Sequence, residues 1–265
     1  MDQHYLALIV EPIRVCASYT PKMGGRNEGG YNLQEFQALY QADPFYSWFG
    51  LDNPLMYAAH KAAGGMTSIY RQIGIGCEVL FRRILQDTLG LPIAETKWSY
   101  QVPLSDNKNR TLSLDGRIPL DLVQNDESKE RIREWIGRKA AELQYDPAIG
   151  AALKGIVFEV RQGYKSKDSK RQNADIANAA AAYQKAYLPC VMILSTQIDY
   201  DIYNRYRLAG WGVLVGKTGD VTSLESTYAF MKDVVGYDLA AFFERNRDRL
   251  RKEIEQVLVA LLKTA

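Results

Sequence analysis

One stretch, residues 155–187, limits the possible folds of this chain more than any other. It opens with the apolar run at residues 156–158, whose length and β-branched content predict a buried central strand. Glu159 and Arg161 follow two residues apart, and because strand side chains alternate between faces, both should project from the same face of the sheet. The strand is therefore predicted to end on a carboxylate and a cation that lie together.

The residues after this strand predict a basic turn and then a helix. The turn carries four cations, which are Lys165, Lys167, Lys170 and Arg171. An alanine-rich segment from about residue 168 to 187 predicts a helix, capped by Asp168 or Ser169 and stopped by Pro189. Strand, basic turn and helix together form an arrangement suited to a functional site.

The size and charge of the chain limit what such a site can serve. With 265 residues, 47% of them hydrophobic, the chain can bury one sizeable core, or one core with a small appendage. We therefore expect a single domain over residues 1–265, with residues 1–65 as an N-terminal arm or helical subregion. The net charge of +2 is close to neutral, so a polyanion must be met by a local patch, for which the basic turn is the best candidate.

Several classes of protein are disfavoured. Three scattered cysteines fit reduced thiols better than disulfides or a zinc site, and two histidines supply little for histidine-based catalysis. No basic leader with an apolar core and no run of 18 apolar residues occurs. We expect a cytoplasmic protein.

The remaining patterns predict an α/β fold, with a central mixed sheet of about five strands flanked by helices. Residues 97–104 and 111–118 predict a hairpin, and residues 5–17 fit either a strand or the edge of a helix. The aromatic segment 44–50 is more typical of helix packing than of a base-stacking platform. The apolar stripe of 238–262 is either core or a dimer face. Further strands are expected at 191–195 and 211–215, and helices at 32–40, 54–63, 66–89, 127–143, 224–235 and 238–262.

Two more carboxylates stand out. Asp115 ends an apolar strand 44 residues before Glu159, and the order strand, helix, strand permits the two to lie side by side. The position of Asp115 directly before Gly116 also fits an ordinary turn residue. Glu78 lies in a predicted helix, where it either pairs with Arg82 four residues on or points toward the sheet.

Asp115, then Glu159 with a cation two residues on, after a helix that bears Glu78, resembles the PD-(D/E)XK nuclease superfamily, in particular type II restriction endonucleases. The resemblance covers residues 73 to about 215 and rests on short motifs. Leu114 precedes Asp115 where many members have proline, and Arg161 stands where the family lysine is expected. Either Arg161 serves in its place or Lys165 reaches in. Asp175, fourteen residues after Arg161, lies where some members keep a displaced helical carboxylate.

The resemblance implies a restriction-endonuclease-like fold and Mg²⁺-dependent hydrolysis of phosphodiester bonds. Asp115 and Glu159 are the expected metal ligands, with Glu78 as a third, and oxygen ligands favour Mg²⁺ over softer metals. A structural ion pair with Arg161 is the alternative. Arginine stays charged and would act only electrostatically, whereas Lys165 could orient or deprotonate the attacking water.

DNA is the expected partner. Arg171, Gln172 and Asn173 have bidentate geometries suited to base edges, and Lys165, Lys167 and Lys170 suit phosphates, although solvated charges at a helix start are an equal alternative. A homodimer would match a palindromic site, and a cognate methyltransferase is expected genetically. Two other functions stay open: a structure-specific repair or recombination nuclease, which Gln184 and Tyr187 faintly suggest, and a DNA-binding module without catalysis.

Overall fold

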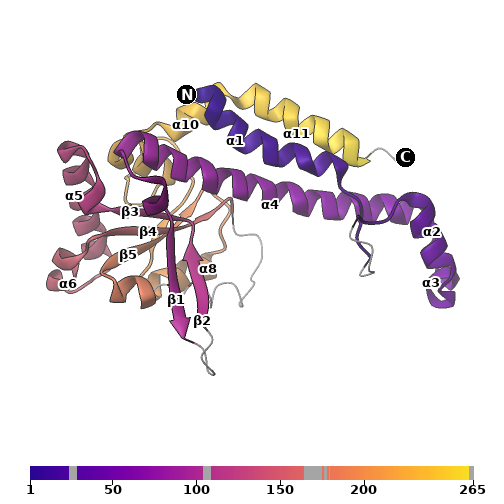
Figure 1. Cartoon of the computed structure of the whole chain (residues 1–265), viewed down its shortest axis with the longest axis horizontal. Helices are drawn as coiled ribbons and strands as arrows, with labels where there is room; N and C mark the ends of the chain where they lie inside the picture. Colours follow the sequence, from indigo (N-terminus) through magenta and orange to yellow (C-terminus); the bar gives the residue numbers. More distant parts are fainter. Residues whose placement is uncertain (24–28, 104–108, 164–174, 176–177, 179, 263–265) are drawn as a thin grey trace. The chain divides into compact units, whose positions relative to one another are not determined.

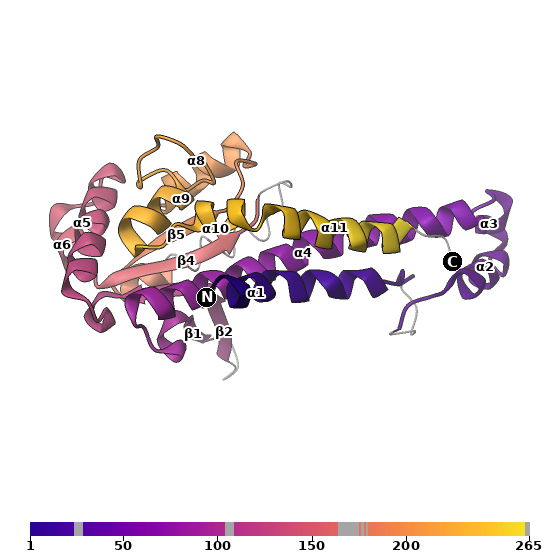
Figure 2. The same cartoon turned by 90° about the horizontal axis from the view of Figure 1, so that it is seen from above.

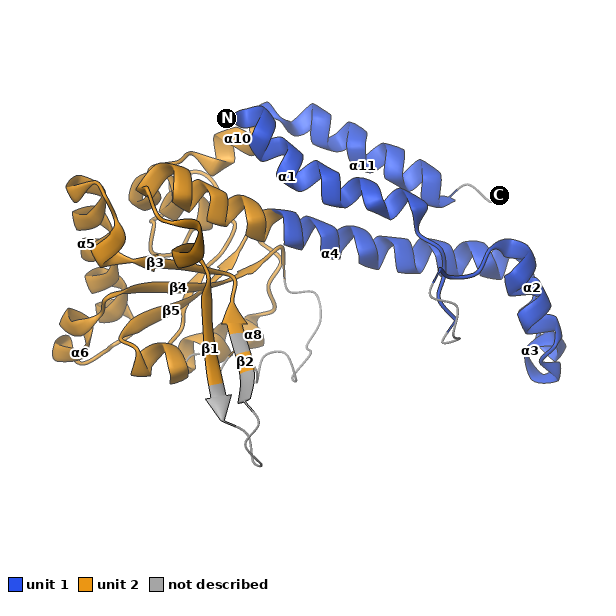
Figure 3. Ribbon diagram, in the orientation of Figure 1, with its two compact units in different colours: residues 1–76, 245–265 blue, residues 77–244 orange. Residues whose placement is uncertain are grey.

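The protein is described here as a computed structural model, which covers residues 1–23, 29–103, 109–163, 175, 178 and 180–262. The chain divides into two units, coloured separately in Figure 3. Unit 1 comprises residues 1–76 and 245–265, and unit 2 comprises residues 77–244. The boundary falls within helix α4 (Pro54–Leu89), which therefore contributes residues to both units.

Unit 2 contains the sheets and has the α/β class that the sequence predicts. Its main sheet has the strand order β3-β4-β5-β6, in which β3 is antiparallel to β4 while β4, β5 and β6 are mutually parallel (Figure 1). A separate antiparallel hairpin joins β1 to β2. The strands are β1 (Trp98–Pro103), β2 (Asn109–Leu114), β3 (Gly116–Pro119), β4 (Gly155–Arg161), β5 (Tyr187–Ile193) and β6 (Gly212–Leu214).

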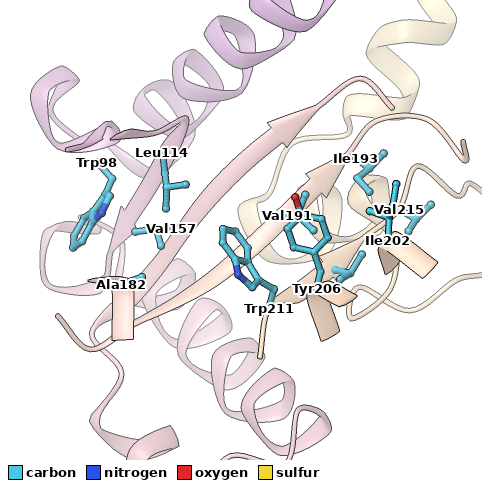
Figure 4. Close-up of a cluster of buried hydrophobic side chains, with 11 residues drawn as sticks. Trp98, Leu114, Val157, Ala182, Val191, Ile193, Ile202, Tyr206, Trp211 and Val215 are labelled. Atoms are coloured by element: carbon cyan, nitrogen blue, oxygen red, sulfur yellow. The ribbon is translucent and has the colours of Figure 1, made fainter. Parts of the chain in front are cut away.

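Strand β4 is buried on both faces, as its uninterrupted apolar run predicts. On one face, Val157 belongs to a cluster of buried side chains that includes Val191 of β5 and Tyr206 (Figure 4). On the other, the Phe158 ring lies 5.0 Å from the ring of Phe81 in α4. The described helices of unit 2 that follow α4 are α5 (Asp126–Glu142), α6 (Pro147–Ala152), α8 (Tyr200–Leu208), α9 (Thr227–Ala229), a π-helical turn at Phe230–Val235, and α10 (Leu239–Arg245).

The predicted helix over residues 168–187 ends earlier than expected. Helical residues are described at 175, 178 and 180–184, and the chain then turns at Ala186, whose φ of 59° is left-handed. Tyr187 begins strand β5, and Pro189 lies inside that strand rather than stopping a helix. The alanine-rich run hides this turn because alanine favours helix on both sides of it.

Unit 1 is helical, and residues 5–17, which fitted either a strand or a helix edge, are helical in it. These residues form α1 (Asp2–Arg14) and a 3₁₀ turn (Val15–Ser18), with Pro12 inside the helix. Helix α1 lies beside α11 (Arg247–Leu262), and both follow the first part of α4 (Figure 2). The guanidinium of Arg14 joins the two helices through an ion pair with the buried Glu253.

Two predicted helices, at 54–63 and 66–89, are in fact the single helix α4. Gly64 and Gly65 do not break it. A Cβ at Gly65 would lie 2.6 Å from the side chain of Leu261, so the glycine permits α4 and α11 to approach closely. The predicted helix over 238–262 is instead divided at Asn246 into α10 and α11, and its stripe is largely core, because Phe242, Val257 and Leu261 are buried.

The aromatic segment at residues 44–50 packs partly against helix α2 (Leu33–Gln41) and partly against itself. It forms the short helix α3 (Pro44–Trp48), which follows α2. Tyr46 stacks on Tyr40 with 4.9 Å between ring centroids, and Phe45 lies 5.1 Å from Phe49. Trp48 nevertheless remains 81% exposed, so helix packing accounts for only part of this segment.

Candidate functional site

Asp115 occupies the junction between β2 and β3. Its Oδ2 accepts a hydrogen bond of 2.8 Å from the backbone N–H of Val160 in β4. Arg82, on α4, donates a hydrogen bond of 2.8 Å to the Asp115 carbonyl oxygen. Gly116 follows because a Cβ there would lie 2.5 Å from the Phe81 ring, so a larger residue would push the strand away from α4. Asp115 is thus fixed between α4 and β4, beside the strand that carries Glu159.

Glu159 and Arg161 share a face of β4, as the strand alternation predicts. The Glu159 side chain is only 7% exposed, and its Oε1 forms an ion pair with Nη2 of Arg161. Val157, two residues earlier on the same face, is part of the apolar cluster that covers this side of the sheet. The two charged groups therefore extend a buried apolar face at the carboxyl end of the strand.

Asp175 completes the cluster from a helix that follows β4 in the chain. The Asp175 side chain is 6% exposed, and its Oδ1 lies 3.5 Å from Nη2 of Arg161. Nη1 of the same guanidinium lies 3.9 Å from Oδ2 of Asp115. The structure therefore brings together four of the predicted site residues: Asp115, Glu159, Arg161 and Asp175.

The electrostatics of this cluster are unbalanced. Among the residues that the structure describes, three carboxylates lie near the guanidinium of Arg161, and Arg82 donates to the backbone carbonyl oxygen of Asp115. Burial raises the pKa of the Asp115 carboxyl above its ordinary value, although the Val160 N–H and the charges of Arg161 and Arg82 favour the ionised form. Such an excess of buried carboxylate is relieved either by a proton or by a further cation.

The donor chemistry fits a hard divalent cation, but the positions are taken by Arg161. Among the residues that the structure describes, no three His, Cys, Asp or Glu side chains are grouped so that they could hold a metal ion. The Arg161 guanidinium instead lies within reach of all three carboxylates. Carboxylate oxygens are the ligands that Mg²⁺ favours, but Asp115, Glu159 and Asp175 as placed surround the guanidinium of Arg161.

The remaining predicted site residues are Glu78 and the residues of the basic turn. Glu78 is half-buried on α4, one turn before Arg82. Its assignment as a third ligand remains a prediction. The predicted DNA contacts, and with them the alternative catalytic lysine, lie outside the described residues: these are Lys165, Lys167, Lys170, Arg171, Gln172 and Asn173.

Two residues of the site were not predicted from the sequence. Arg82 was considered only as a partner of Glu78, yet it binds the carbonyl of Asp115. Tyr206, in α8, donates a hydrogen bond to Oδ2 of Asp175. Tyr206 and Ile202 are both buried and four residues apart, so helical spacing could have indicated that Tyr206 faces the core.

Comparison of the chain with protein-family models, curated proteins and solved structures gives no match. Within the described residues, no helix combines the length and apolar character needed to cross a bilayer. Gln184 and Tyr187, which faintly suggested a helical nuclease motif, do not share a helix, since Tyr187 begins β5.

Proposed function

We propose that this chain is a Mg²⁺-dependent type II restriction endonuclease that hydrolyses phosphodiester bonds of double-stranded DNA at a short palindromic site. The observation that carries the proposal is the gathering of Asp115, Glu159 and Asp175 around Arg161. A buried group of carboxylates is costly as a purely structural feature. In the proposed enzyme, these carboxylates would hold the Mg²⁺ that assists phosphodiester hydrolysis.

The strand arrangement supports the same proposal. Asp115 separates β2 from β3, so the hairpin β1-β2 continues directly into the strand that pairs with β4. Followed through this junction, the strands form a path of β1, β2 with β3, β4, β5 and β6. We propose that this path is the five-stranded sheet of a restriction-endonuclease-like fold.

Each residue of the cluster has a distinct proposed role. Asp115, Glu159 and Asp175 would hold Mg²⁺, which when bound supplies a water of lowered pKa and neutralises charge on the phosphate. Arg161 stays protonated at any working pH, so it cannot take a proton from water. Its proposed role is to balance the carboxylates before the ion binds and to stabilise the charge of the scissile phosphate afterwards.

Sequence recognition and assembly are proposed on the resemblance alone. The turn residues Lys165, Lys167 and Lys170 would contact phosphates, and Arg171, Gln172 and Asn173 would contact bases. A homodimer would match the two-fold symmetry of a palindrome. The proposed location is the cytoplasm, where such an enzyme meets incoming DNA.

A DNA-binding module without catalysis is the second candidate function. The observation that favours it is Arg161 itself, whose guanidinium already contacts all three carboxylates. In a non-catalytic protein, this cluster would be a structural ion network that joins β4 to the following helix.

Digestion of plasmid DNA with and without Mg²⁺ tests the proposal. Discrete bands that require Mg²⁺ would support a restriction endonuclease. A smear, or nicking confined to irregular structures, would indicate a nuclease of different specificity. Binding to DNA without any cleavage, across divalent cations and DNA sources, would contradict the proposal and favour the binding module.

A further inference from the structure

The segment that comprises α2, α3 and the first turn of α4 exposes a large apolar surface. Trp48 is 81% exposed, Phe49 67%, and Leu55, in the first turn of α4, 74%. The Phe45 ring adjoins this surface, since it lies 5.1 Å from the ring of Phe49 and 5.9 Å from that of Tyr46. Within unit 1, α2 and α3 lie at the start of α4, beyond the C-terminal ends of α1 and α11 (Figure 2). The aromatic patch is defined as Leu39, Phe45, Tyr46, Trp48, Phe49 and Leu55, each at least 40% exposed.

The exposed area of the aromatic patch is close to what one subunit contributes to a stable dimer. An aromatic side chain can bury about 150–250 Å². The exposed parts of four aromatic rings and two leucines therefore amount to several hundred Å². A standard protein–protein interface buries about 800 Å² per partner, whereas a monomer rarely exposes a contiguous apolar patch larger than a few hundred Å². The patch has the size of an interface.

The charges around the aromatic patch exclude a polyanion as its partner. From residue 29 to residue 60, the sequence contains three acidic residues, Glu35, Asp43 and Asp52, and no lysine or arginine. The phosphates of DNA and of anionic lipid headgroups are attracted by lysine and arginine. An acidic surface without these cations suits neither of them.

Two of these carboxylates are already compensated within their own chain. Asp43 Oδ1 accepts a hydrogen bond of 2.9 Å from the backbone N–H of Phe45, at the start of α3. Glu35, in the first turn of α2, accepts a hydrogen bond of 2.9 Å from the backbone N–H of Asn32. The start of a helix favours negative charge, so these carboxylates do not require a basic partner. What the patch presents is aromatic surface poor in free charge, which is the composition of homodimer interface cores.

We propose that the aromatic patch is the surface through which two copies of this chain associate, patch against patch around a two-fold axis. The inference rests on the proposed function in that a palindrome-cutting enzyme calls for a homodimer, but the surface itself is argued from its exposure and charge. Trp48 has the largest exposed fraction in the patch, and buried tryptophans contribute most to the affinity of interfaces.

Sedimentation equilibrium of the full chain without DNA tests the proposal. The parent should dimerise reversibly, and Trp48→Ala should weaken the dimer at least about 30-fold, the loss expected from a hot-spot tryptophan. Added NaCl should leave the parent dimer intact or strengthen it, because salt screens the like charges of the two patches. A dimer that dissociates in salt would contradict an apolar contact. Circular dichroism checks that the variant is folded.

Tyr200→Ala is the matched control. Tyr200 is an aromatic residue of α8 in unit 2, is 75% exposed and lies outside the aromatic patch. This variant should dimerise as the parent does. Equal weakening by Tyr200→Ala and Trp48→Ala would show that loss of any exposed aromatic side chain reduces association, and it would overturn the proposal.

Tryptophan fluorescence identifies the surface that is buried on association. Trp98, Trp135 and Trp211 are at most 5% exposed, so quenching by acrylamide reports mainly on Trp48. Quenching should fall as the protein concentration rises through the dimerisation range. A dimer in which Trp48 is quenched as in the monomer would associate through another surface, and that result would overturn the proposal.

A parent that stays monomeric at every concentration would also overturn the proposal. If that monomer bound phosphatidylcholine vesicles with shielding of Trp48, the patch would be a lipid contact instead. Failure of the nuclease function gives a different result. A dimer that shields Trp48 but never cleaves DNA supports this interface and refutes the proposed function, whereas DNA cleavage by a protein that stays monomeric refutes only the interface.

Discussion

At the residue scale, the guanidinium of Arg161 serves three carboxylates that come from different parts of the chain. The ion pair with Glu159 is local, whereas Asp115 and Asp175 are brought by a neighbouring strand and by the following helix. Neutralising one of these carboxylates reduces the mutual repulsion between the carboxylates around Arg161. The fold should therefore tolerate a neutral substitution at one of these carboxylates.

We predict that Asp115→Asn and Glu159→Gln each abolish Mg²⁺-dependent cleavage while DNA binding is retained. Asparagine keeps an oxygen for the Val160 N–H, so the backbone is preserved while the ligand charge is lost. The rate of single-turnover cleavage should fall by more than the roughly 100-fold upper range for an outer-shell residue. Glu134→Gln, an exposed change on α5, is the control and should cut normally.

Arg161 gives a prediction with two opposite parts. Arg161→Ala removes the cation that competes for the carboxylates, so it should bind Mn²⁺ more tightly than the parent, yet it should lose most cleavage. Arg161→Lys, which keeps the charge, should retain measurable activity.

Lys165→Ala should weaken DNA binding more than turnover at saturating enzyme. A Lys165→Ala protein that binds DNA normally but cannot cut would instead assign the catalytic role to Lys165.

The sequence carries the local part of this site but not its long-range contacts. The spacing of two residues predicts that Glu159 and Arg161 lie on one face, whereas the strand order only permits Asp115 to lie beside Glu159. The contacts of Arg82 and Tyr206 join residues 33 and 31 positions apart, on different elements. No periodicity records such contacts, because they depend on how helices are placed over the sheet.

At the element scale, strand β4 depends on its first residue. Gly155 lies opposite Pro119 of β3, and a Cβ there would lie 2.1 Å from the carbonyl oxygen of Ile118. Because the added Cβ and the Ile118 carbonyl oxygen are fixed to two paired backbones, neither can rotate away, and the strands would have to separate. Their separation would shift Asp115, at the far end of β3, relative to Glu159.

We therefore predict that Gly155→Ala lowers the free energy of unfolding by more than about 1 kcal/mol, the range for alanine at an incompatible site. Gly137→Ala is the control, because Gly137 lies in α5 with no atom within 4 Å of an added Cβ. Alanine should stabilise that helix slightly. Urea denaturation of both variants measures the difference, and an unchanged midpoint for Gly155→Ala would contradict this account of the register.

The ends of helices and strands were predictable where the residue composition changes along the chain. They were not predictable where packing against another element sets the boundary. The capped helix α2 and the buried strand β4 follow directly from their residues, since caps and apolar runs are local signals. The continuity of α4 through Gly64 and Gly65 and the early start of β5 do not. Leu261 packs where a side chain at Gly65 would stand, and Ala186 turns the chain against its own helical preference.

At the scale of the whole molecule, unit 1 joins the two ends of the chain. Glu253 on α11 is buried, and its carboxylate bonds to Arg14 on α1 and to Arg249 on its own helix. Arg245, the last residue of α10, also donates a hydrogen bond to Asp2 of α1. The 239 positions between Arg14 and Glu253 make this a contact that only the folded chain can form.

The ion pairs of Glu253 should make the stability of unit 1 depend on pH. The hydrogen bond from Arg14, with the charges of Arg14 and Arg249, lowers the pKa of Glu253 below its ordinary value. A carboxylate whose pKa is lower in the folded state contributes stability above the unfolded pKa, and this contribution is lost as the pH falls through the folded pKa.

Glu253→Gln should therefore lower Tm by several degrees at pH 7. The difference from the parent should shrink as the pH falls through the lowered pKa of folded Glu253, because both side chains are uncharged below it. Glu255→Gln, exposed on the same helix, controls for the change in net charge. A Tm difference that stayed constant from pH 7 to acid would show that Glu253 acts through shape rather than charge.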